Sequence, residues 1–467
     1  MRGKVFFSGF SRYSSIMLIC LLVMLLAFGC KQKDESVSRL KDVSVFKLDQ
    51  PLLQNFVRGQ VCQCGEEPDA SVKVHAGFKS EKPLYGSVRF AGGFDVQDSG
   101  IQYHFAVDES AGTGQGYDRL YFDLNRDLDL TNDTPLVPLK NPPDGAMLSY
   151  SSLKQQICFR FLNVNFDFGT DGERALEIMP RLMIYNGGFT QMAFVTTRAH
   201  KGRIKIAGQR YDVLLGHNYL ISGWFDRPWT ALHLIPNGDS YRMPSWSGAD
   251  RLMAIHKIDQ TYYRFSAAPA GNKLLAQPYE GDFGTFEVGP GGRDIRKMGI
   301  RGSLFSRDIA VAVGGNLEAG WPRETRRSRV PVGDYLTDSM SISLGSLRIF
   351  ISNNYHSDGK PRDMDRPKLY AIKIRKDEPY IFDFSNDPKV MFASPAKDHR
   401  VKLGEELQVK AVLIDPELDI MIRRLDDTGT EQKQKNVSLD PTFVRLGSDK
   451  SHLRIPTIIN HKSWHDL

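Results

Sequence analysis

Short runs in which apolar and polar residues alternate dominate the chain after residue 65. They occur at 71–75, 101–107, 157–168, 203–206, 262–265, 341–344, 347–351 and 407–413. Alternation with a period of two places the apolar side chains on one face of a strand, which is typical of half-buried antiparallel sheets. Glycine, proline, asparagine and aspartate stand between the runs, as turns require. The pattern predicts a mainly β protein made of several antiparallel sandwich- or barrel-like units.

Changes in this pattern divide the chain into segments. Residues 1–29 are read as a signal segment and the charged residues 30–60 as a tether. A β domain with an Asp/Asn-rich loop is expected at 61–197, a second at 198–325 and a connecting β segment at 326–379. The run at 401–413 resembles the early strands of immunoglobulin-like domains, without their Cys and Trp hallmarks. The last segment, 380–467, is therefore expected to be immunoglobulin-like, and incomplete because the pattern fades from about Asp449.

The first thirty residues have the layout of a secretory signal. Arg2, Lys4 and Arg12 precede an apolar stretch from 16 to 29, and no acidic residue offsets them. This stretch is short for a membrane span and suits the apolar region of a signal peptide. The end of the stretch, Gly29 followed by Cys30, resembles the lipobox of bacterial lipoproteins. The resemblance implies that Cys30 is acylated and becomes the first residue of the mature chain.

Two alternatives remain for this segment, because the residues at 27 and 28 are not those commonest in a lipobox. The segment could be an ordinary signal cleaved elsewhere or an uncleaved anchor. All three interpretations place the body of the protein outside the cytoplasm, on the periplasmic or surface face of a bacterial envelope. With lipid on Cys30, the membrane itself becomes a partner, since two or more acyl chains hold a soluble body almost permanently.

Charge gives little indication of a nucleic-acid partner. The formal net charge of the 467 residues is +6, and loss of the signal would leave 58 basic against 55 acidic residues. Nucleic-acid binding needs basic residues clustered on one surface. The one dense run, at 323–329, is most simply an exposed linker. We therefore expect no nucleic-acid partner.

Three cysteines remain if Cys20 leaves with the signal and Cys30 carries lipid: Cys62, Cys64 and Cys158. Cys62 and Cys64 are too close in sequence to bond easily to each other. A disulfide from one of them to Cys158 is one possibility in an oxidising compartment, and free thiols are another. Zinc is a third, although no spacing of Cys and His completes a set of four ligands.

One loop carries a metal-like motif. Asp123, Asn125, Asp127 and Asp129 stand at alternate positions after a strand-like segment, and Asp133 follows. This spacing is similar to that of EF-hand loops, in which several oxygens converge on calcium. The loop lacks the usual Gly at position 6 and Glu at position 12, so an Asx-rich turn is the alternative. Any calcium here would be structural.

A second strand and loop, at 213–228, line up with this motif at an offset of 93. The alignment matches Asn125 with Asn218, but the positions of Asp123, Asp127 and Asp129 are taken by residues that could not hold an ion. A duplicated β unit with one altered loop would explain it. The strand and Asp/Asn-loop pattern resembles that of secreted all-β proteins of environmental bacteria to which no activity is assigned.

Aromatic residues concentrate in the same region. Trp224, Trp229, Tyr241 and Trp246 lie within 23 residues, among polar side chains. Flat rings beside hydrogen-bonding groups are surfaces on which sugars stack, so a glycan site is one interpretation and core packing is the other. Signatures of zinc proteases, serine hydrolases and nucleotide-binding loops are missing from the sequence.

These features favour a lipid-anchored envelope protein with a binding or scaffolding role, whose partner is a glycan or an envelope protein. No catalytic residue can be assigned, and no cofactor other than structural calcium is expected. The alternative is a surface or periplasmic hydrolase acting on polysaccharide, with carboxylates that linear spacing does not reveal.

Overall fold

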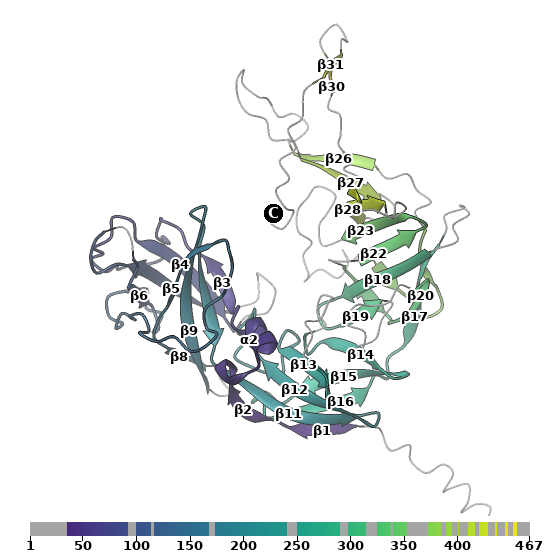
Figure 1. Ribbon diagram of the computed structural model, residues 1–467, viewed down its shortest axis with the longest axis horizontal. Coiled ribbons are helices and arrows are strands. Elements are labelled where there is room, and N and C mark those ends of the chain that lie inside the picture. The colour runs from purple at the N-terminus through teal and green to yellow at the C-terminus, as the bar shows by residue number, and fades with distance from the viewer. Residues whose placement is uncertain are drawn as a thin grey trace, which may run out of the picture.

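The computed structural model describes residues 35–91, 100–113, 116–167, 173–240, 250–289, 298–313, 325–337, 340–352, 372–383 and 389–394, and short segments at 400, 410–415, 420–427, 435–436, 444–446 and 452–454. The fold is mainly β with several antiparallel sheets, as the alternating pattern predicts. Figure 1 shows three groups of strands arranged along an arc. We call them the first unit (60–196), the middle unit (36–57 with 198–278) and the third unit (from 283 onward).

The first unit is a sandwich of two sheets. A three-stranded sheet, β4-β5-β6, packs on a sheet in the order β3-β10-β9-β7, with β8 also paired to β9. The rings of Phe105 and Phe122 each lie 5.8 Å from that of Phe194 and fill the space between the sheets. The strands are β3 (Gln60–Gln63), β4 (Leu84–Phe90), β5 (Ile101–Asp108), β6 (Arg119–Phe122), β7 (Leu153–Cys158), β8 (Leu162–Asp167), β9 (Glu173–Tyr185) and β10 (Thr190–Thr196).

The middle unit is a second sandwich and includes the first described strands of the chain. One layer has the order β13-β12-β11-β2, and the facing layer is β14-β15-β16-β1. Its elements are β1 (Ser36–Arg39), β2 (Lys41–Ser44), a 3-10 turn η1 (Val45–Lys47), α2 (Gln50–Phe56), β11 (Arg198–Ile206), β12 (Gln209–Gly216), β13 (Ala231–Pro236), β14 (Ala254–Ile258), β15 (Thr261–Ala267) and β16 (Lys273–Pro278).

The chain crosses from one layer of the middle unit to the other at Leu40. Strand β1 pairs with β16, and β2 pairs with β11. Leu40, between them, is buried in the core of the sandwich, and its amide donates to the carbonyl of Asn272 at 2.8 Å. Ser38 Oγ also donates to the carbonyl of Arg203 at 2.7 Å. The two strands therefore join both layers on the outer, convex edge of the arc (Figure 1).

Helix α2 is a wedge between the first and middle units. Leu52 and Phe56 pack on the middle unit, whereas Leu53 and Val57 pack on β9 and β10 of the first unit. Each pair is spaced four residues apart and so shares one side of the helix. Figure 1 shows α2 on the inner side of the arc. The helix therefore fixes the first unit against the middle one.

The third unit continues a sheet that begins in the middle unit. Strands β14 and β19 pair in parallel, and the resulting twelve-stranded sheet runs from β1 to β26. Its elements are β17 (Phe283–Val288), β18 (Met298–Phe305), β19 (Ala310–Val313), β20 (Arg327–Pro331), β21 (Gly333–Tyr335), β22 (Met340–Leu344), β23 (Leu347–Ser352), β24 (Ile372–Ile374), β25 (Tyr380–Phe382), β26 (Lys389–Ser394), β27 (Lys410–Asp415), β28 (Ile420–Asp427), β29 (Lys435–Asn436), β30 (Val444–Leu446) and β31 (His452–Arg454). Apolar residues of β17, β20, β24 and β25 face this sheet.

Several expected boundaries move. The chain does change sheet at Thr197, between β10 and β11, near the expected boundary at 197. The segment 30–60, expected to be a tether, contains β1, β2, η1 and α2 from residue 36 onward, because Ser38 and Leu40 turn inward. A boundary at 325 would separate β20 from β17, its partner in an antiparallel pair. The third unit therefore begins near residue 283.

Three local expectations also change. Residues 71–75 do not form a regular strand; Val74 makes a single bridge to Asp129. The run at 157–168 divides into the end of β7 and the whole of β8, both paired with the long strand β9. The described part of the basic run, 325–329, leads into β20, and Arg326 and Arg327 pair with Glu287. Within the described part of 380–467, β26 to β28 extend the twelve-stranded sheet, so an immunoglobulin-like domain stays unconfirmed.

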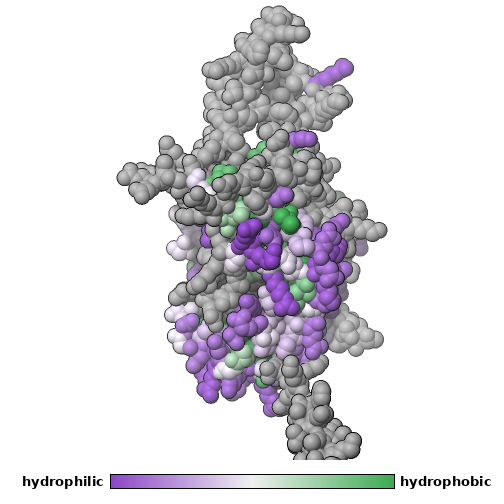
Figure 2. Space-filling model, turned by 90° about the vertical axis from the view of Figure 1, so that its right-hand side faces the viewer, coloured by the Kyte–Doolittle hydropathy of each residue, from purple (hydrophilic) through white to green (hydrophobic). Residues whose placement is uncertain are grey.

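The outer side of the third unit is predominantly hydrophilic where it is described. Figure 2 shows this side with purple and white side chains and scattered green ones. Single exposed apolar residues are normal on a soluble surface.

Candidate functional site

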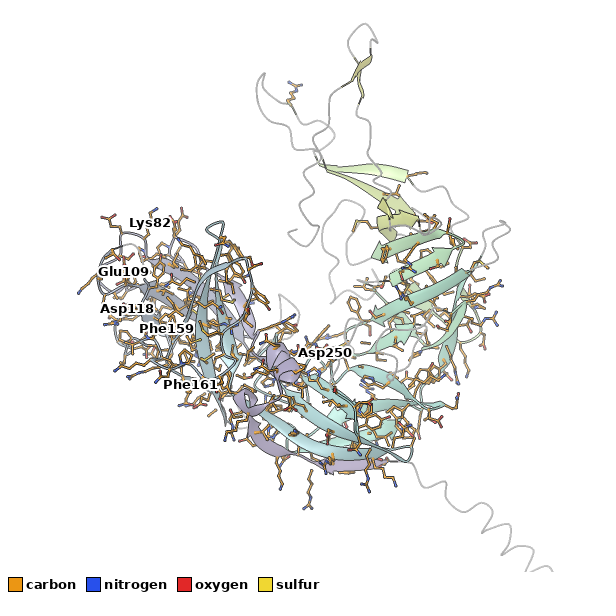
Figure 3. All side chains as sticks on the ribbon, viewed as in Figure 1. Lys82, Glu109, Asp118, Phe159, Phe161 and Asp250 are labelled. Carbon is orange, nitrogen blue, oxygen red and sulfur yellow. The ribbon has the colours of Figure 1, made fainter. Side chains whose placement is uncertain are left out.

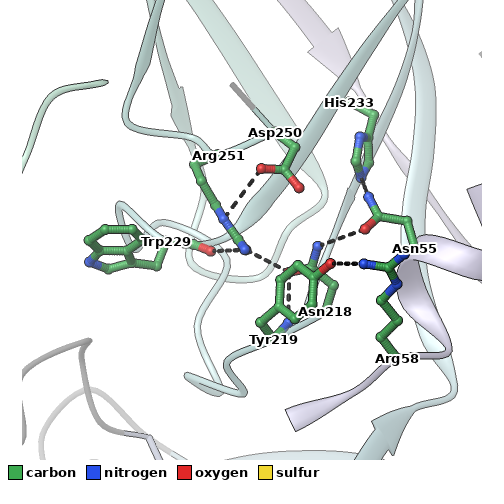
Figure 4. Close-up of polar contacts among 8 residues, drawn as sticks. All are labelled: Asn55, Arg58, Asn218, Tyr219, Trp229, His233, Asp250 and Arg251. Atoms are coloured by element: carbon green, nitrogen blue, oxygen red, sulfur yellow. Dashed lines mark hydrogen bonds and ion pairs between the residues drawn. The ribbon is translucent and has the colours of Figure 1, made fainter. Parts of the chain in front are cut away.

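A buried polar network within the middle unit connects helix α2 to the loops around β12 and β13 (Figure 4). Its centre is Asn218, in the loop after β12. Oδ1 of Asn218 accepts from Nη1 of Arg251 at 2.5 Å and from the amide of Tyr219 at 2.7 Å. Nδ2 of Asn218 donates to Oδ1 of Asn55, on α2, at 3.5 Å. One side chain thus connects the wedge helix to the loops of the middle unit.

Arg251 is nearly buried and its charge is compensated. Its guanidinium lies 3.6 Å from the carboxylate of Asp250 and donates to the carbonyl of Trp229 at 3.0 Å. It also lies over the ring of Tyr219, 5.1 Å from the centroid. A buried cation needs such partners, since desolvation without them is costly. Arg251 therefore acts as a fixed cross-link of three loop segments.

The network ends in a neutral histidine. Nδ2 of Asn55 donates to Nε2 of His233 at 2.9 Å, so this ring nitrogen is an acceptor. Burial lowers the pKa of His233 to about 4; Asp250 opposes the shift and Arg251 adds to it. His233 also packs edge-on against Phe56, with the ring centroids 5.4 Å apart. A buried histidine that stays neutral and serves as an acceptor fits a structural role.

Arg58 is the partly exposed cation of this region. It follows α2, and its Nη1 donates to the hydroxyl of Tyr219 at 3.0 Å. The hydroxyl of Tyr150, from the first unit, is a second hydrogen-bond partner. Both tyrosines raise the pKa of Arg58, although burial alone would lower it. The arrangement offers a fixed guanidinium and two aromatic rings, which are groups that bind a ligand.

Of the four aromatic residues expected to form a glycan platform, the structure describes Trp224 and Trp229. Trp224 is only 5% exposed, and its carbonyl accepts from Ser222 Oγ at 2.6 Å and from Thr230 Oγ1 at 3.3 Å. Trp229 is partly exposed and contributes its carbonyl to the Arg251 network. Tyr241 and Trp246 lie outside the described residues. For Trp224 the core interpretation holds.

The Asp/Asn loop is organised by hydrogen bonds to its own backbone. Asp123 is fully buried and accepts from the amide of Asp127 at 3.1 Å and that of Leu128 at 3.1 Å. Asn125 Oδ1 accepts from the amide of Asp127 at 3.0 Å, and Asp133 Oδ2 accepts from that of Leu124 at 2.9 Å. The contact of Asn125 with the amide two residues on is an Asx turn, and the other three close the loop over longer spans.

The remaining ligand candidates follow the same rule. Asp127 Oδ1 accepts from the amide of Asp129 at 2.9 Å, and Asp129 Oδ1 accepts from that of Thr131 at 2.8 Å. Burial raises the pKa of Asp123, and repulsion from Asp127 and Asp133 adds to the shift while backbone donors oppose it. Within the described ranges, no three His, Cys, Asp or Glu side chains converge as metal ligands do.

The three cysteines of the body are free thiols in the structure. Cys62 lies on β3 and Cys158 on β7, at opposite edges of a sheet in which β10 and β9 lie between them. Three strand spacings separate them by roughly 14 Å, whereas a disulfide needs Cα atoms within about 7 Å. Burial raises the pKa of Cys62 beyond its usual range and that of Cys64 to about 12. Cys30 lies outside the described residues.

Sequence reasoning missed the residues at the centre of the junction: Asn55, Arg58, Asn218, Asp250 and Arg251. None stands in a motif, and they come from segments far apart in the chain. The one available signal was Asn218, which aligned with Asn125 of the Asp/Asn loop. That alignment identified a loop of the right type but not its contacts.

Comparison with known proteins adds no identification. No family model, curated protein or solved structure matches this chain. Among the residues that the structure describes, no helix has the length and apolar character needed to cross a membrane. The function therefore has to be argued from the sequence and from this geometry.

Proposed function

We propose that this is a lipid-anchored protein of the bacterial cell envelope, with a binding or scaffolding role toward a glycan or an envelope protein. The lipid is carried by Cys30 and the body lies outside the cytoplasm. The observation that carries the proposal is the position of β1, which begins six residues after Cys30 and pairs with β16 along the convex edge of the arc. An anchor at this place holds the middle of the molecule.

The attachment is suited to bear an anchor. Four residues of β1 pair with β16 and four of β2 pair with β11, so a pull on the N-terminal segment is distributed over both layers of the middle unit. Arg198 adds an ion pair to Asp42 on β2. The first and third units extend from the middle one on the side away from β1 (Figure 1). The membrane would thus lie at the convex side, and the inner side with its polar junction would face outward.

Calcium in the Asp/Asn loop is a further part of the proposal. The support is electrostatic: burial raises the pKa of Asp123 and repulsion from Asp127 and Asp133 adds to the shift, so the loop gathers negative charge that a divalent cation would relieve. The segment at 73–74 holds the loop from outside, since the amide of Lys73 donates to the carbonyl of Leu128 at 2.9 Å. The ion's role would be to stiffen the turn beyond β6.

Acylation of Cys30 tests the anchoring. The full chain would be produced in a Gram-negative host, labelled with a clickable palmitate analogue and separated into membrane and soluble fractions. We expect label in the membrane fraction, and loss of both label and membrane association in Cys30→Ser. Cys20→Ser is the matched control, since it changes a cysteine of the same segment and should leave labelling intact. Labelling that persists in Cys30→Ser would contradict the proposal.

A further inference from the structure

We propose that the protein binds an anionic polysaccharide along a strip formed by Phe189, Tyr185, Tyr150, Arg58 and Tyr219. We call these five residues the tyrosine–arginine strip. The inference rests on the binding role proposed above and names its ligand class and its place. The strip begins on the first unit, passes the end of α2 and reaches the loop after β12 in the middle unit.

The first end of the strip presents aromatic area to solvent. Phe189 is 43% exposed and Tyr150 is 41% exposed. The rings of Phe189 and Tyr185 lie 5.6 Å apart, tilted by 42°. Asn186 fixes this hairpin to the neighbouring loop, since its amide donates to the carbonyl of Ser152 at 2.8 Å. The rings are therefore held in place before any ligand arrives.

Tyr150 connects this end to the cation. It lies close enough to Tyr185 to raise the pKa of that hydroxyl, after the larger effect of burial, and it hydrogen-bonds with Arg58. Arg58 in turn bonds to Tyr219 at 3.0 Å. The tyrosine–arginine strip is thus continuous, and the guanidinium of Arg58 lies between the hydroxyls of Tyr150 and Tyr219. A line of rings that crosses two units suits an extended polymer better than a small molecule.

Arg58 gives the strip its charge preference. Among the described residues it has two tyrosine partners and no carboxylate partner, and its Nε is buried without a hydrogen bond. Arg251, by contrast, is neutralised by Asp250. A guanidinium held in a fixed plane pairs with carboxylates through two donors. Aromatic faces next to it stack on sugar rings, so uronate-containing polysaccharide fits both features.

A peptide partner is less well supported. Extended peptides commonly add to a free sheet edge, and the strip consists of side chains from a hairpin, two loops and the end of a helix. An acidic polypeptide would engage Arg58 through charge but would leave the ring faces of Phe189 and Tyr150 without a flat partner. The comparison between an acidic polysaccharide and an acidic polypeptide is therefore decisive.

The test is binding of the full chain, purified in detergent, to three polymers: polygalacturonate, neutral dextran and polyglutamate. We expect polygalacturonate to bind, and we expect the affinity for dextran and for polyglutamate to be at least tenfold lower. Arg58→Gln should weaken the binding of polygalacturonate about tenfold, and Phe189→Ala should weaken it several-fold. Phe189 is exposed on a hairpin, so Phe189→Ala keeps the test valid if Arg58→Gln folds poorly, which thermal denaturation would reveal.

Two matched controls lie outside the strip. Phe161→Ala removes an aromatic ring that is 37% exposed on the same unit, and Figure 3 shows Phe161 there, away from Asp250 at the junction. Arg203→Gln removes an exposed arginine of β11. Both should bind as the unchanged chain does. No binding of polygalacturonate, equal binding of polyglutamate, or strip variants that match the controls would overturn the inference. Acylation of Cys30 is measured separately, so the anchoring proposal would survive such a result.

Discussion

Arg251 and Asn218 form a buried pair in which the guanidinium donates to the side-chain carbonyl at 2.5 Å. Neither residue is on a regular strand, and 33 residues of chain separate them. Their bond closes the middle unit around the loop after β12 and, through Asn55, holds α2. One amide group therefore links α2 to the loops of the middle unit.

Replacing that amide tests its importance. Asn218→Ala leaves the buried Arg251 with one acceptor fewer and removes one hydrogen-bond partner of Asn55, so we expect the free energy of unfolding to fall by about 2–4 kcal/mol. Chemical denaturation followed by circular dichroism measures it. Asn237→Ala changes an exposed asparagine of the same unit and should stay within about 0.5 kcal/mol. A loss no larger than that of the control would show that the network contributes little.

Acid should destabilise the middle unit. Burial lowers the pKa of His217 to about 3, with His200 adding to the shift; it lowers that of His256 to about 3 and that of His233 to about 4. Between these values and the ordinary 6.5, the unfolded chain binds protons that the folded chain does not. Stability is therefore full above pH 6.5 and falls as the pH drops, by roughly 1.4 kcal/mol per pH unit for each histidine.

Urea denaturation at pH 7.5, 6 and 5 measures this slope. His217→Phe removes one titrating ring and keeps a flat ring against Phe225, whose ring centroid lies 4.6 Å away with an angle of 14° between the planes. It also breaks no hydrogen bond among the described residues, because neither ring nitrogen of His217 has a partner there. We expect this variant to lose stability less steeply with acid than the unchanged chain. Parallel slopes for the two proteins would contradict the assignment.

The crossing at Leu40, between β1 and β2, should be destabilised by one added methyl group. A Cβ on Gly202 would lie 2.5 Å from Cδ2 of Leu40 and 2.8 Å from the carbonyl oxygen of Arg39. The second of these is backbone and cannot turn aside, so Gly202→Ala should cost about 1–3 kcal/mol and loosen β1 and β2. Limited proteolysis at 36–47 and thermal denaturation measure both effects. Gly77→Ala, which meets nothing within 4 Å, is the control and should resemble the unchanged chain.

Calcium should raise the melting temperature if the Asp/Asn loop takes an ion. We expect a rise of a few degrees at millimolar calcium, none with magnesium, and no rise in Asp123→Ala. Asp123→Ala should also lower the melting temperature without calcium, because the amides of Asp127 and Leu128 lose their acceptor. An unchanged melting temperature of the intact protein in calcium would leave the loop as an Asx turn closed by its own backbone.

The sequence predicted the β class because alternation is a local property that each strand carries by itself. Strands such as β5 and β15 follow their predicted runs closely, and the change of sheet at Thr197 lies at the expected boundary. Helix α2 was not predicted. It has seven residues, too few to show a helical periodicity in the sequence. The helix is stabilised because Phe56 and Val57 pack against different units.

The candidate site could not be predicted from the sequence for a related reason. Asn55, Arg58 and Asn218 are ordinary surface residue types, and only the fold brings their segments together. Trp224, one of the four aromatic residues expected to bind a glycan, is a core residue, whereas Phe189, which the sequence did not single out, carries an exposed ring. The type of a residue indicates which ligands it could bind, but its burial in the fold decides whether a ligand can contact it.

The pairing of Val37 with Leu275 sets an order of events during folding. All strands of the first unit lie between Gln60 and Thr196, so this unit has every partner it needs once that stretch of chain has emerged. The middle unit must wait for β16, and closing so long a loop is slow. A chain that leaves the ribosome or a translocon N-terminus first would therefore carry β1 as an unpaired edge beside an already folded neighbour. Until β16 emerges, this N-terminal segment is exposed to aggregation and proteolysis.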